Sequence, residues 1–321
     1  MKSGRSLSGG MLFKEHLLLI LVIIMMLLFH QSSYADKNSG TVCSSSCGSI
    51  HNIKSPFRLT TDPLSCGDLR YNLSCENNIL VLYLPVYQYS GIYERKIYYV
   101  QAINYNNYTI RVVDPNIYHH KDDCSSIPNN TLSLDDLYVR DSYTVKILLG
   151  LSYNESERRY PMRTLVDNVV FFNCESPALN SSYIDAAPCL FNDTFSTRRH
   201  YYSYYYVSDG SSRFNFSELE ESCWIQQVTL IEKGANLDRS NASSDEIHKV
   251  LVYGFQLSWI QSLDKRTDMG RVCYLLNQDS SLVRCVSRCQ INDYFDRSNS
   301  FECGKDILTV TKNLTFIVTS F

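Results

Sequence analysis

The chain has 321 residues, which is long for one domain and suits one large or two small ones. Hydrophobic residues make up 44% of the chain, and its formal net charge is −3 at pH 7. The chain therefore has no global basic field, which argues against nucleic acid as a partner. Tyrosine favours strands, and the chain holds 24 Tyr against 2 Trp. We therefore expect a mainly β fold.

The first 35 residues predict a signal peptide. An apolar run, LLLILVIIMMLLF at 17–29, is followed by SYA, whose small residues fit a cleavage site directly before Asp36. The run is preceded by a basic segment with Lys2, Arg5 and Lys14. As a helix it spans about 20 Å, short of the ~30 Å of a bilayer core. We expect cleavage and export, with an uncleaved signal anchor as the alternative.

Twelve cysteines follow the predicted signal peptide. They are Cys43, Cys47, Cys66, Cys75, Cys124, Cys174, Cys189, Cys223, Cys273, Cys285, Cys289 and Cys303. An even number in an exported chain predicts six disulfides. The spacing does not give the connectivity, but five cysteines precede residue 140, so complete pairing requires a bridge between the two halves. A zinc site is the weaker alternative, because no Cys-x-x-Cys pair occurs.

Nine Asn-x-Ser/Thr sequons lie in the same part of the chain. They start at Asn72, Asn107, Asn129, Asn154, Asn180, Asn192, Asn215, Asn241 and Asn313. Such sequons accept N-linked glycans on the surfaces of exported proteins. We expect a heavily glycosylated surface.

Strand patterns begin after the Cys-dense segment that ends at Cys75. NILVLYL at 78–84 predicts a strand that ends at Pro85. ERKIYYVQAI and YTIRVVD follow as two strands around the turn NYNN at 104–107.

This hairpin is rich in Tyr and Asn, which suits either a sugar-binding face or an ordinary half-buried hairpin. Alternation places Ile110 and Val112 on one face, which we expect to be core. Thr109 and Arg111 point the other way. We interpret the hairpin as scaffold, with only the Arg111 side as a candidate contact.

The second half of the chain continues the strand patterns. Strands are predicted at 143–151, 168–174, 199–207 and 224–231. SSDEIHKVLVYGFQLSW at 243–259 predicts a helix capped by Ser244, a break at Gly254 and a strand. The strand RHYYSYYYV carries Tyr202, Tyr204 and Tyr206 on one face. We interpret it as a strand with one core face and one exposed tyrosine face; sugar stacking or a protein contact is the alternative.

Several phrases together resemble the ectodomains of plant receptor-like kinases. CSSSCGSIHNIKSPFRLTTDPLSCGDLRYNLSCENNILVLYL, YVQAINYNNYTIRVVD and DDCSSIPNNTLSLDDL are similar to the galacturonan-binding module of wall-associated kinases, closest to the leaf-rust-resistance type. VVFFNC, the spacing of Cys189 and Cys223, and EIHKVLVYGFQLSW are similar to the associated C-terminal module. The phrase NIKSPF departs from the family's Asn-Ile-Ser-Tyr-Pro-Phe at Lys54 and Ser55. The extra cysteines that the family carries after GFQLSW are also missing before Cys273.

The resemblance implies a mainly β, disulfide-rich ectodomain of two small β-rich modules with few short helices. The expected organisation is a signal peptide at 1–35, a galacturonan-binding-like module at 36–139, a C-terminal-like module at 140–305 and an apolar tail without a membrane helix at 306–321. The family continues into a membrane helix and a Ser/Thr kinase, and this sequence contains neither; it has no Gly-rich phosphate loop and no His-Arg-Asp loop. We expect a secreted or cell-surface protein: a receptor's outer half, a secreted form, a truncated product or a fragment.

By implication of the family, the function is non-catalytic binding of a pectin-like cell-wall polysaccharide. A polyanion is bound by Arg and Lys side chains, with calcium bridging to Asp and Glu as the weaker alternative. The candidate ligand contacts are Arg58, Arg95, Lys96 and Arg111. The alternative is a protein-interaction ectodomain that binds a peptide or a co-receptor, or acts as a decoy, with a membrane receptor kinase as partner.

We expect no enzyme activity, no cofactor and no metal. No Gly-x-Ser-x-Gly elbow occurs, and oxidised cysteines offer no nucleophile. A carboxylate pair for glycoside hydrolysis is invisible in a sequence, so a hydrolase stays the minor alternative. The spacing of the possible ligands in HHKDDC at 119–124 is poor for a metal site, so we interpret this stretch as a solvated loop.

Overall fold

The computed structural model describes one part of the chain. The described residues are 43–87, 93–139, 141–150, 161–180, 182–190, 201–208, 219–235, 237, 242–264, 271–276 and 282–287. The predicted signal peptide and the apolar tail therefore lie outside the described residues.

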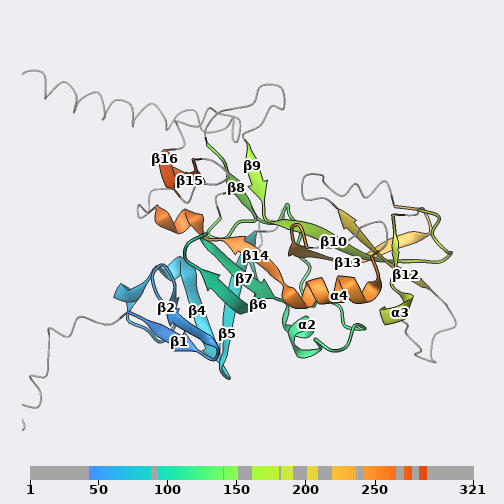
Figure 1. Ribbon diagram of the computed structural model, residues 1–321, viewed down its shortest axis with the longest axis horizontal. Helices are drawn as coiled ribbons and strands as arrows, with labels where there is room; N and C mark the ends of the chain where they lie inside the picture. Colours follow the sequence, from blue (N-terminus) through green and yellow to red (C-terminus); the bar gives the residue numbers. More distant parts are fainter. Residues whose placement is uncertain are drawn as a thin grey trace, which may run out of the picture. The chain divides into compact units, whose positions relative to one another are not determined.

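The protein is mainly β and rich in disulfides, with few short helices, as expected (Figure 1). The larger sheet has six strands, in the spatial order β14 (Phe255–Ser258), β7 (Thr109–Val113), β6 (Tyr93–Asn104), β5 (Ile79–Tyr87), β4 (Asn72–Glu76) and β3 (Arg58–Leu59). Neighbouring strands are antiparallel except β3 and β4, which are parallel. A strand from residues 255–258 thus completes a sheet whose other strands all precede residue 114. The expected module boundary at 139/140 stays a prediction.

One face of the six-stranded sheet packs on the largest core. Its alternating inward side chains are almost fully buried; they include Leu80, Leu82, Leu84, Tyr98, Val100, Ile110, Val112, Phe255 and Leu257. Burying one such side chain stabilises the fold by about 1.5–3 kcal/mol. Ile110 and Val112 are 0% exposed, which agrees with the core role expected from the hairpin pattern.

The prediction that Pro85 stops its strand is wrong. β5 continues through Pro85, which pairs with Arg95 of β6. β4 pairs with β5 only over Ile79, Leu80 and Val81. Beyond that point β6 is the only partner of β5 among the described strands, so β5 is an edge strand there, where a missing N–H is tolerated.

The smaller sheet has four strands in the order β11 (Ile184–Asp185), β12 (Tyr202–Ser208), β10 (Val166–Cys174) and β13 (Cys223–Glu232). Both of its faces are packed. Phe171 and Tyr205 lie in one core cluster, and Phe172 lies in another with Tyr204 and Tyr206 packed against it. The sequence predicts one exposed tyrosine face without indicating which. Tyr205 on one face is 2% exposed, and on the other face Tyr204 and Tyr206 are packed while Tyr202 is 44% exposed.

Helix α4 (Ser244–Tyr253) is the longest described helix. Its cap is Ser243, not Ser244 as expected: the Ser243 hydroxyl accepts from the Glu246 backbone, and the Glu246 carboxylate accepts from the Ser243 backbone. A capping box needs a Glu three residues after the N-cap residue. Glu246 lies three residues after Ser243, so Ser243 and not Ser244 is the N-cap. The helix ends at Gly254, whose φ is 84°, and β14 follows directly. The break expected at Gly254 is confirmed.

Smaller elements complete the fold. Three two-stranded pairs are β1 (Ser45–Cys47) with β2 (Ile50–Ile53), β8 (Lys146–Leu148) with β9 (Met162–Thr164), and β15 (Arg271–Leu275) with β16 (Val283–Ser287). The remaining helices of the described residues are α2 (Pro115–His119), α3 (Ala187–Leu190) and the 3₁₀ turns η1 (Leu64–Cys66), η2 (Leu69–Tyr71) and η4 (Ile260–Leu263).

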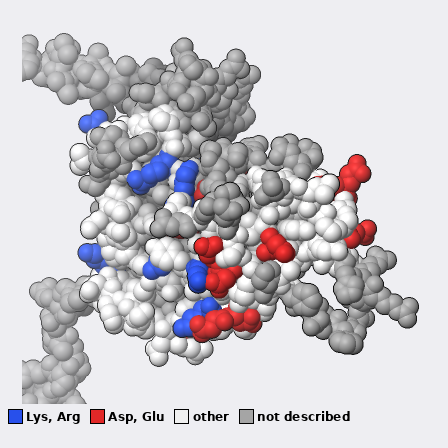
Figure 2. Space-filling view, turned by 45° about the vertical axis from the view of Figure 1, so that its right-hand side comes forward, with Lys and Arg blue, Asp and Glu red and all other residues white. Residues whose placement is uncertain are grey.

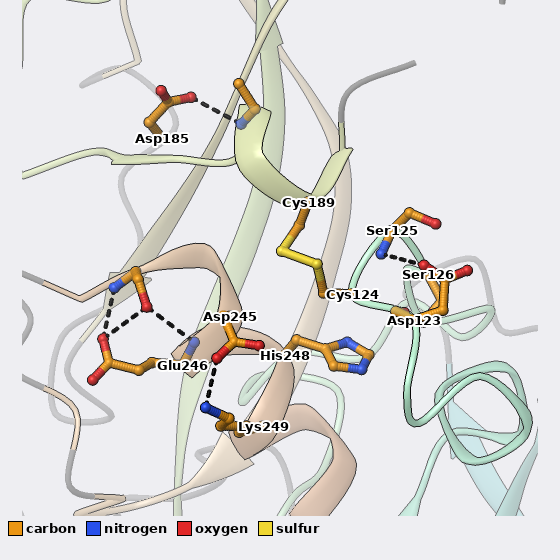
Figure 3. Close-up of a disulfide and its surroundings, with 12 residues drawn as sticks. Asp123, Cys124, Ser125, Ser126, Asp185, Cys189, Asp245, Glu246, His248 and Lys249 are labelled. Atoms are coloured by element: carbon orange, nitrogen blue, oxygen red, sulfur yellow. Dashed lines mark hydrogen bonds and ion pairs between the residues drawn. A yellow bond between two sulfur atoms is a disulfide. The ribbon is translucent and has the colours of Figure 1, made fainter. Parts of the chain in front are cut away.

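Five disulfides join ten of the twelve cysteines. The pairs are Cys43–Cys66, Cys47–Cys75, Cys124–Cys189, Cys174–Cys223 and Cys273–Cys285; Cys289 and Cys303 lie outside the described residues. Cys124–Cys189 is the expected bridge between the two halves. Figure 3 shows this bridge beside α4, whose buried His248 bonds through Nε2 to the Lys121 carbonyl at 3.0 Å. This disulfide and α4 thus both fasten the loop that follows α2.

Candidate functional site

The outer face of the six-stranded sheet is exposed at one end. Alternation brings Tyr83 of β5 opposite Ile97 of β6, and Tyr93 and Arg95 lie on the same side of β6. Tyr83 is 40% exposed, Tyr93 47% and Ile97 42%, and Arg95 is also exposed. We call these four residues the open face.

Helix α2 borders the open face along β6. Tyr99, two residues beyond Ile97, lies edge-on to the ring of Tyr118 at 5.2 Å, and its hydroxyl lies 3.2 Å from Nε2 of His119. Tyr118 is 36% exposed, so it extends the aromatic surface beyond the strands.

A buried carboxylate holds this border in place. Asp114 caps α2 by accepting from the backbone of Asn116, and it also accepts from the backbone N–H groups of Asn129 and Asn130 and from the Asn130 side chain. The Asn130 amide also donates to the Ile97 carbonyl at 2.8 Å. Asp114 therefore fixes both α2 and the segment that runs beside the open face.

The open face combines the two groups that an acidic sugar chain requires. Exposed tyrosine rings offer flat apolar surfaces with polar tips, and an arginine guanidinium matches the two oxygens of a carboxylate. The Tyr83 hydroxyl donates to Glu76 at 2.8 Å, and this hydrogen bond is the main cause of a raised pKa for Tyr83. The bond also orients the Tyr83 ring.

The structure does not bring the four predicted contact residues into one site. Arg58 is 4% exposed and donates to Asn72 at 2.7 Å and to the carbonyls of Asp62 and Pro63, so its guanidinium holds the chain itself. Lys96 points to the side opposite Arg95 and pairs with Glu94 at 3.1 Å. Of these residues, only Arg95 belongs to the open face.

Arg111 lies on the same sheet face as Arg95, but it is covered. Its guanidinium stacks on the Tyr253 ring of α4 at 4.2 Å and donates to the Tyr253 carbonyl at 3.1 Å. Opposite Arg111 in the register is Gln256, whose amide donates to Glu232 of β13 at 2.7 Å. The Arg111 side of the hairpin is therefore an internal contact.

Glu232 is unusual within this contact. One carboxylate oxygen binds Gln256, while the other is buried and has no hydrogen-bond partner among the described residues. Burial raises the pKa of Glu232 to about 7, against the opposing effects of Arg111 and the Gln256 hydrogen bond.

The loop HHKDDC is engaged in local bonds. His119 contacts Tyr99, His120 bonds to the Asn116 carbonyl, and Asp123 accepts from the Ser125 backbone. Hydrogen bonding with Ser125, first through its side chain and then through its backbone, lowers the pKa of Asp123. In the described part of the chain, no group of three or more His, Cys, Asp or Glu side chains is placed to hold a metal ion.

Four of the nine sequons fall on described residues. Asn107, Asn129 and Asn180 are exposed, and Asn107 lies in the turn between β6 and β7. Asn72 is half-buried, and its oxygen binds Arg58. Glycosylation of these sites stays a prediction. The remaining sequons lie outside the described residues: Asn154, Asn192, Asn215, Asn241 and Asn313.

Residues 43–114 match the family model for wall-associated receptor kinase galacturonan-binding. This segment is similar to the galacturonan-binding modules of wall-associated receptor kinases. The match runs from β1 to β7 and includes the open face, but it does not include β14. It confirms the resemblance of the N-terminal phrases to this module, while the resemblance of the second half to a C-terminal module and the likeness to the leaf-rust-resistance type stay predictions. No curated protein and no solved structure matches the chain.

The distribution of basic side chains suits a local contact with an acidic ligand better than an extended one. On the side shown in Figure 2, the Lys and Arg side chains of the coloured residues lie in separate groups, several beside acidic side chains. Over the described ranges, no helix is long and apolar enough to cross a membrane.

Tyr83 and Ile97 were missed by reasoning from the sequence, which looked for basic residues. The signal was present for Tyr83: in NILVLYL it alternates with Leu80, Leu82 and Leu84, which predicts a tyrosine on the face opposite the core.

Proposed function

We propose that the open face binds a pectin-like polysaccharide without catalysis, outside the cell or at its surface. The chain would act as the ectodomain of a receptor-like kinase or as a secreted form of one. One observation carries the proposal: Tyr83, Arg95 and Ile97 are exposed side by side on β5 and β6, within the segment that matches the family.

The proposed binding mode follows from these side chains. A pyranose ring stacks on Tyr83 or Tyr93, and its carboxylate accepts from Arg95. Ile97 keeps the surface between them apolar. Arg95 has no ion pair within the described ranges, so a ligand carboxylate has no internal carboxylate to displace.

The test is calorimetric titration of the purified chain with a homogeneous oligogalacturonide at low and at high salt. We expect saturable binding that weakens with salt, because exposed charges are screened. Arg95→Ala should weaken binding about tenfold and reduce its salt dependence, the effect of losing one charge-assisted hydrogen bond of about 1.5 kcal/mol. Tyr83→Ala should weaken binding at either salt concentration.

Arg284→Ala is the matched control, because Arg284 is an exposed arginine on β16, away from β5 and β6. If Arg95→Ala and Tyr83→Ala both bind like the unmodified chain, the open face is not the site. Capture of a membrane receptor kinase without any binding of oligogalacturonide would instead favour the protein-interaction alternative. Release of shorter sugars from pectin would contradict a non-catalytic role.

A further inference from the structure

A second exposed aromatic pair lies on the four-stranded sheet, beside the Cys174–Cys223 disulfide. Trp224 of β13 is 39% exposed and Tyr201, directly before β12, is 43% exposed. Their ring centroids are 4.8 Å apart with planes at 86°, so the two rings form an open corner. We call Trp224, Tyr201, Asn173 and Ser203 the aromatic corner.

A β-bulge gives Trp224 its direction. Phe171 pairs with Gln227 while Phe172 pairs with Ile225, so Gln226 is an extra residue in β13. Trp224 therefore points to the same side of the sheet as Phe171; without the extra residue it would point to the opposite side. Phe171 is buried in the core cluster that α4 covers, whereas Trp224 lies beyond this cover.

Neutral polar groups lie beside the two rings in a fixed arrangement. Ser203 donates to the Asn173 side-chain oxygen at 2.7 Å, and the Asn173 amide nitrogen lies 3.3 Å from the Gln226 oxygen. Asn173 pairs in register with both Trp224 and Ser203, so this network borders the rings. The exposed Gln226 presents its amide nitrogen as a further donor. Such groups match the hydroxyls of a sugar.

The described charges at this end of the sheet are acidic. Glu175 and Glu221 are exposed next to the strand ends, and Glu220 accepts from the backbone of Leu179 and Asn180. In Figure 2 the coloured residues at the right show Asp and Glu but neither Lys nor Arg. Arg198 and Arg199 precede Tyr201 in the sequence and lie outside the described residues. The described surroundings therefore disfavour a polyanion and favour an uncharged partner.

We propose that the aromatic corner binds a neutral sugar chain, at a site separate from the open face. One pyranose ring packs on Trp224 against the edge formed by Tyr201, and its hydroxyls bond to Gln226, Asn173 and the acidic side chains at the strand ends. The chain would then contact two kinds of polysaccharide, one acidic and one neutral.

The different exposure of the two tryptophans allows this proposal to be tested by fluorescence. Trp259 is 2% exposed, so a ligand-induced change in indole fluorescence reports Trp224. The purified chain would be titrated with neutral hexasaccharides of glucose, mannose, galactose and xylose. We expect a saturable emission change with at least one of them. Trp224→Ala and Tyr201→Ala should weaken that binding at least tenfold by calorimetry, whereas the exposed control Tyr138→Ala should not.

The two sites are distinguished by their variants. Arg95→Ala and Tyr83→Ala should leave binding of the neutral hexasaccharide unchanged, so a failure of the open face does not affect this inference. Absence of binding by every neutral hexasaccharide would overturn it. Binding of oligogalacturonide or of a proline-rich peptide that depends on Trp224 would assign the corner to another ligand. An emission change produced by enzymatic removal of N-glycans alone would assign the corner to the chain's own glycan.

Discussion

Arg95 and Arg111 occupy the same face of the same sheet in opposite surroundings. Around Arg95 the outer face is open, whereas Arg111 is covered by Tyr253 of α4 and faces Gln256 across the β7–β14 pair. The residues that cover Arg111 lie far from it in the sequence: Tyr253, which accepts a hydrogen bond from Arg111, follows it by 142 positions. One arginine is thus exposed in the proposed site, while the other is held by an internal contact. Three predictions test this difference.

The largest expected effect concerns the point where the cover joins the sheet. A Cβ at Gly254 would collide with the Val112 carbonyl oxygen, and the φ of 84° is itself unfavourable for other residues. Gly254→Ala should therefore reduce the free energy of unfolding by about 3 kcal/mol, measured by urea denaturation.

Gly234→Ala is the control for this substitution. Gly234 has a similar φ of 73°, but a Cβ there meets no atom within 4 Å. Its cost should be about 1 kcal/mol, from the backbone conformation alone. Equal losses in the free energy of unfolding for the two variants would mean that the junction of α4 and β14 does not pack closely against β7.

The second prediction concerns pH. The folded-state pKa of Glu232, about 7, is above its ordinary value of 4.5, so the folded chain holds this proton more tightly than the unfolded chain. The resulting stability is fully present below pH 4.5 and is lost as the pH rises through about 7. After discounting for partial exposure, we expect a fall of about 1 kcal/mol between pH 5 and pH 8.

Glu232→Gln should remove this part of the pH dependence, because the amide stays neutral over the whole range. The exposed control Glu221→Gln should retain the slope of the unmodified chain. Urea denaturation at pH 5, 6, 7 and 8 measures each slope. A Glu232→Gln slope equal to that of the unmodified chain would contradict the assignment.

The third prediction separates the two arginines directly. Arg111→Ala should lower the free energy of unfolding by about 1 kcal/mol, since it removes the stacking on Tyr253 and one hydrogen bond. Its affinity for oligogalacturonide should stay unchanged. Arg95→Ala should show the reverse pattern. Weaker sugar binding in Arg111→Ala than in Arg95→Ala would refute the comparison.

Local patterns predicted the parts of the fold that depend on alternation and turn chemistry. Period-two spacing placed Ile110 and Val112 in the core, and Gly254 ended its helix where expected. The cap was misplaced by one residue, although the Ser-x-x-Glu pattern that identifies Ser243 was visible. The error at Pro85 had a different origin, because the length of the neighbouring strand β4 decides whether β5 is an edge there.

The candidate site was harder to predict, because its composition depends on contacts distant in sequence. Four basic residues looked equivalent in the sequence, and only strand register and burial separate Arg95 from Arg58, Lys96 and Arg111. The aromatic corner depends on the bulge at Gln226, which the sequence WIQQV does not reveal. Tyr201 and Trp224 meet because β12 and β13 both pair with β10.

The position of β14 has a consequence for the boundaries of expression fragments. The segment that matches the family ends at residue 114, but the neighbour of β7 in the sheet is a strand from Phe255–Ser258. A fragment cut at the matched boundaries would leave the N–H and C=O groups of β7 unpaired along one side. It would also uncover Ile110 and Val112, against which Leu257 and Phe255 are paired. An unpaired strand edge can pair with the edge of another molecule. A fragment intended to stay monomeric should therefore include the residues through Ser258.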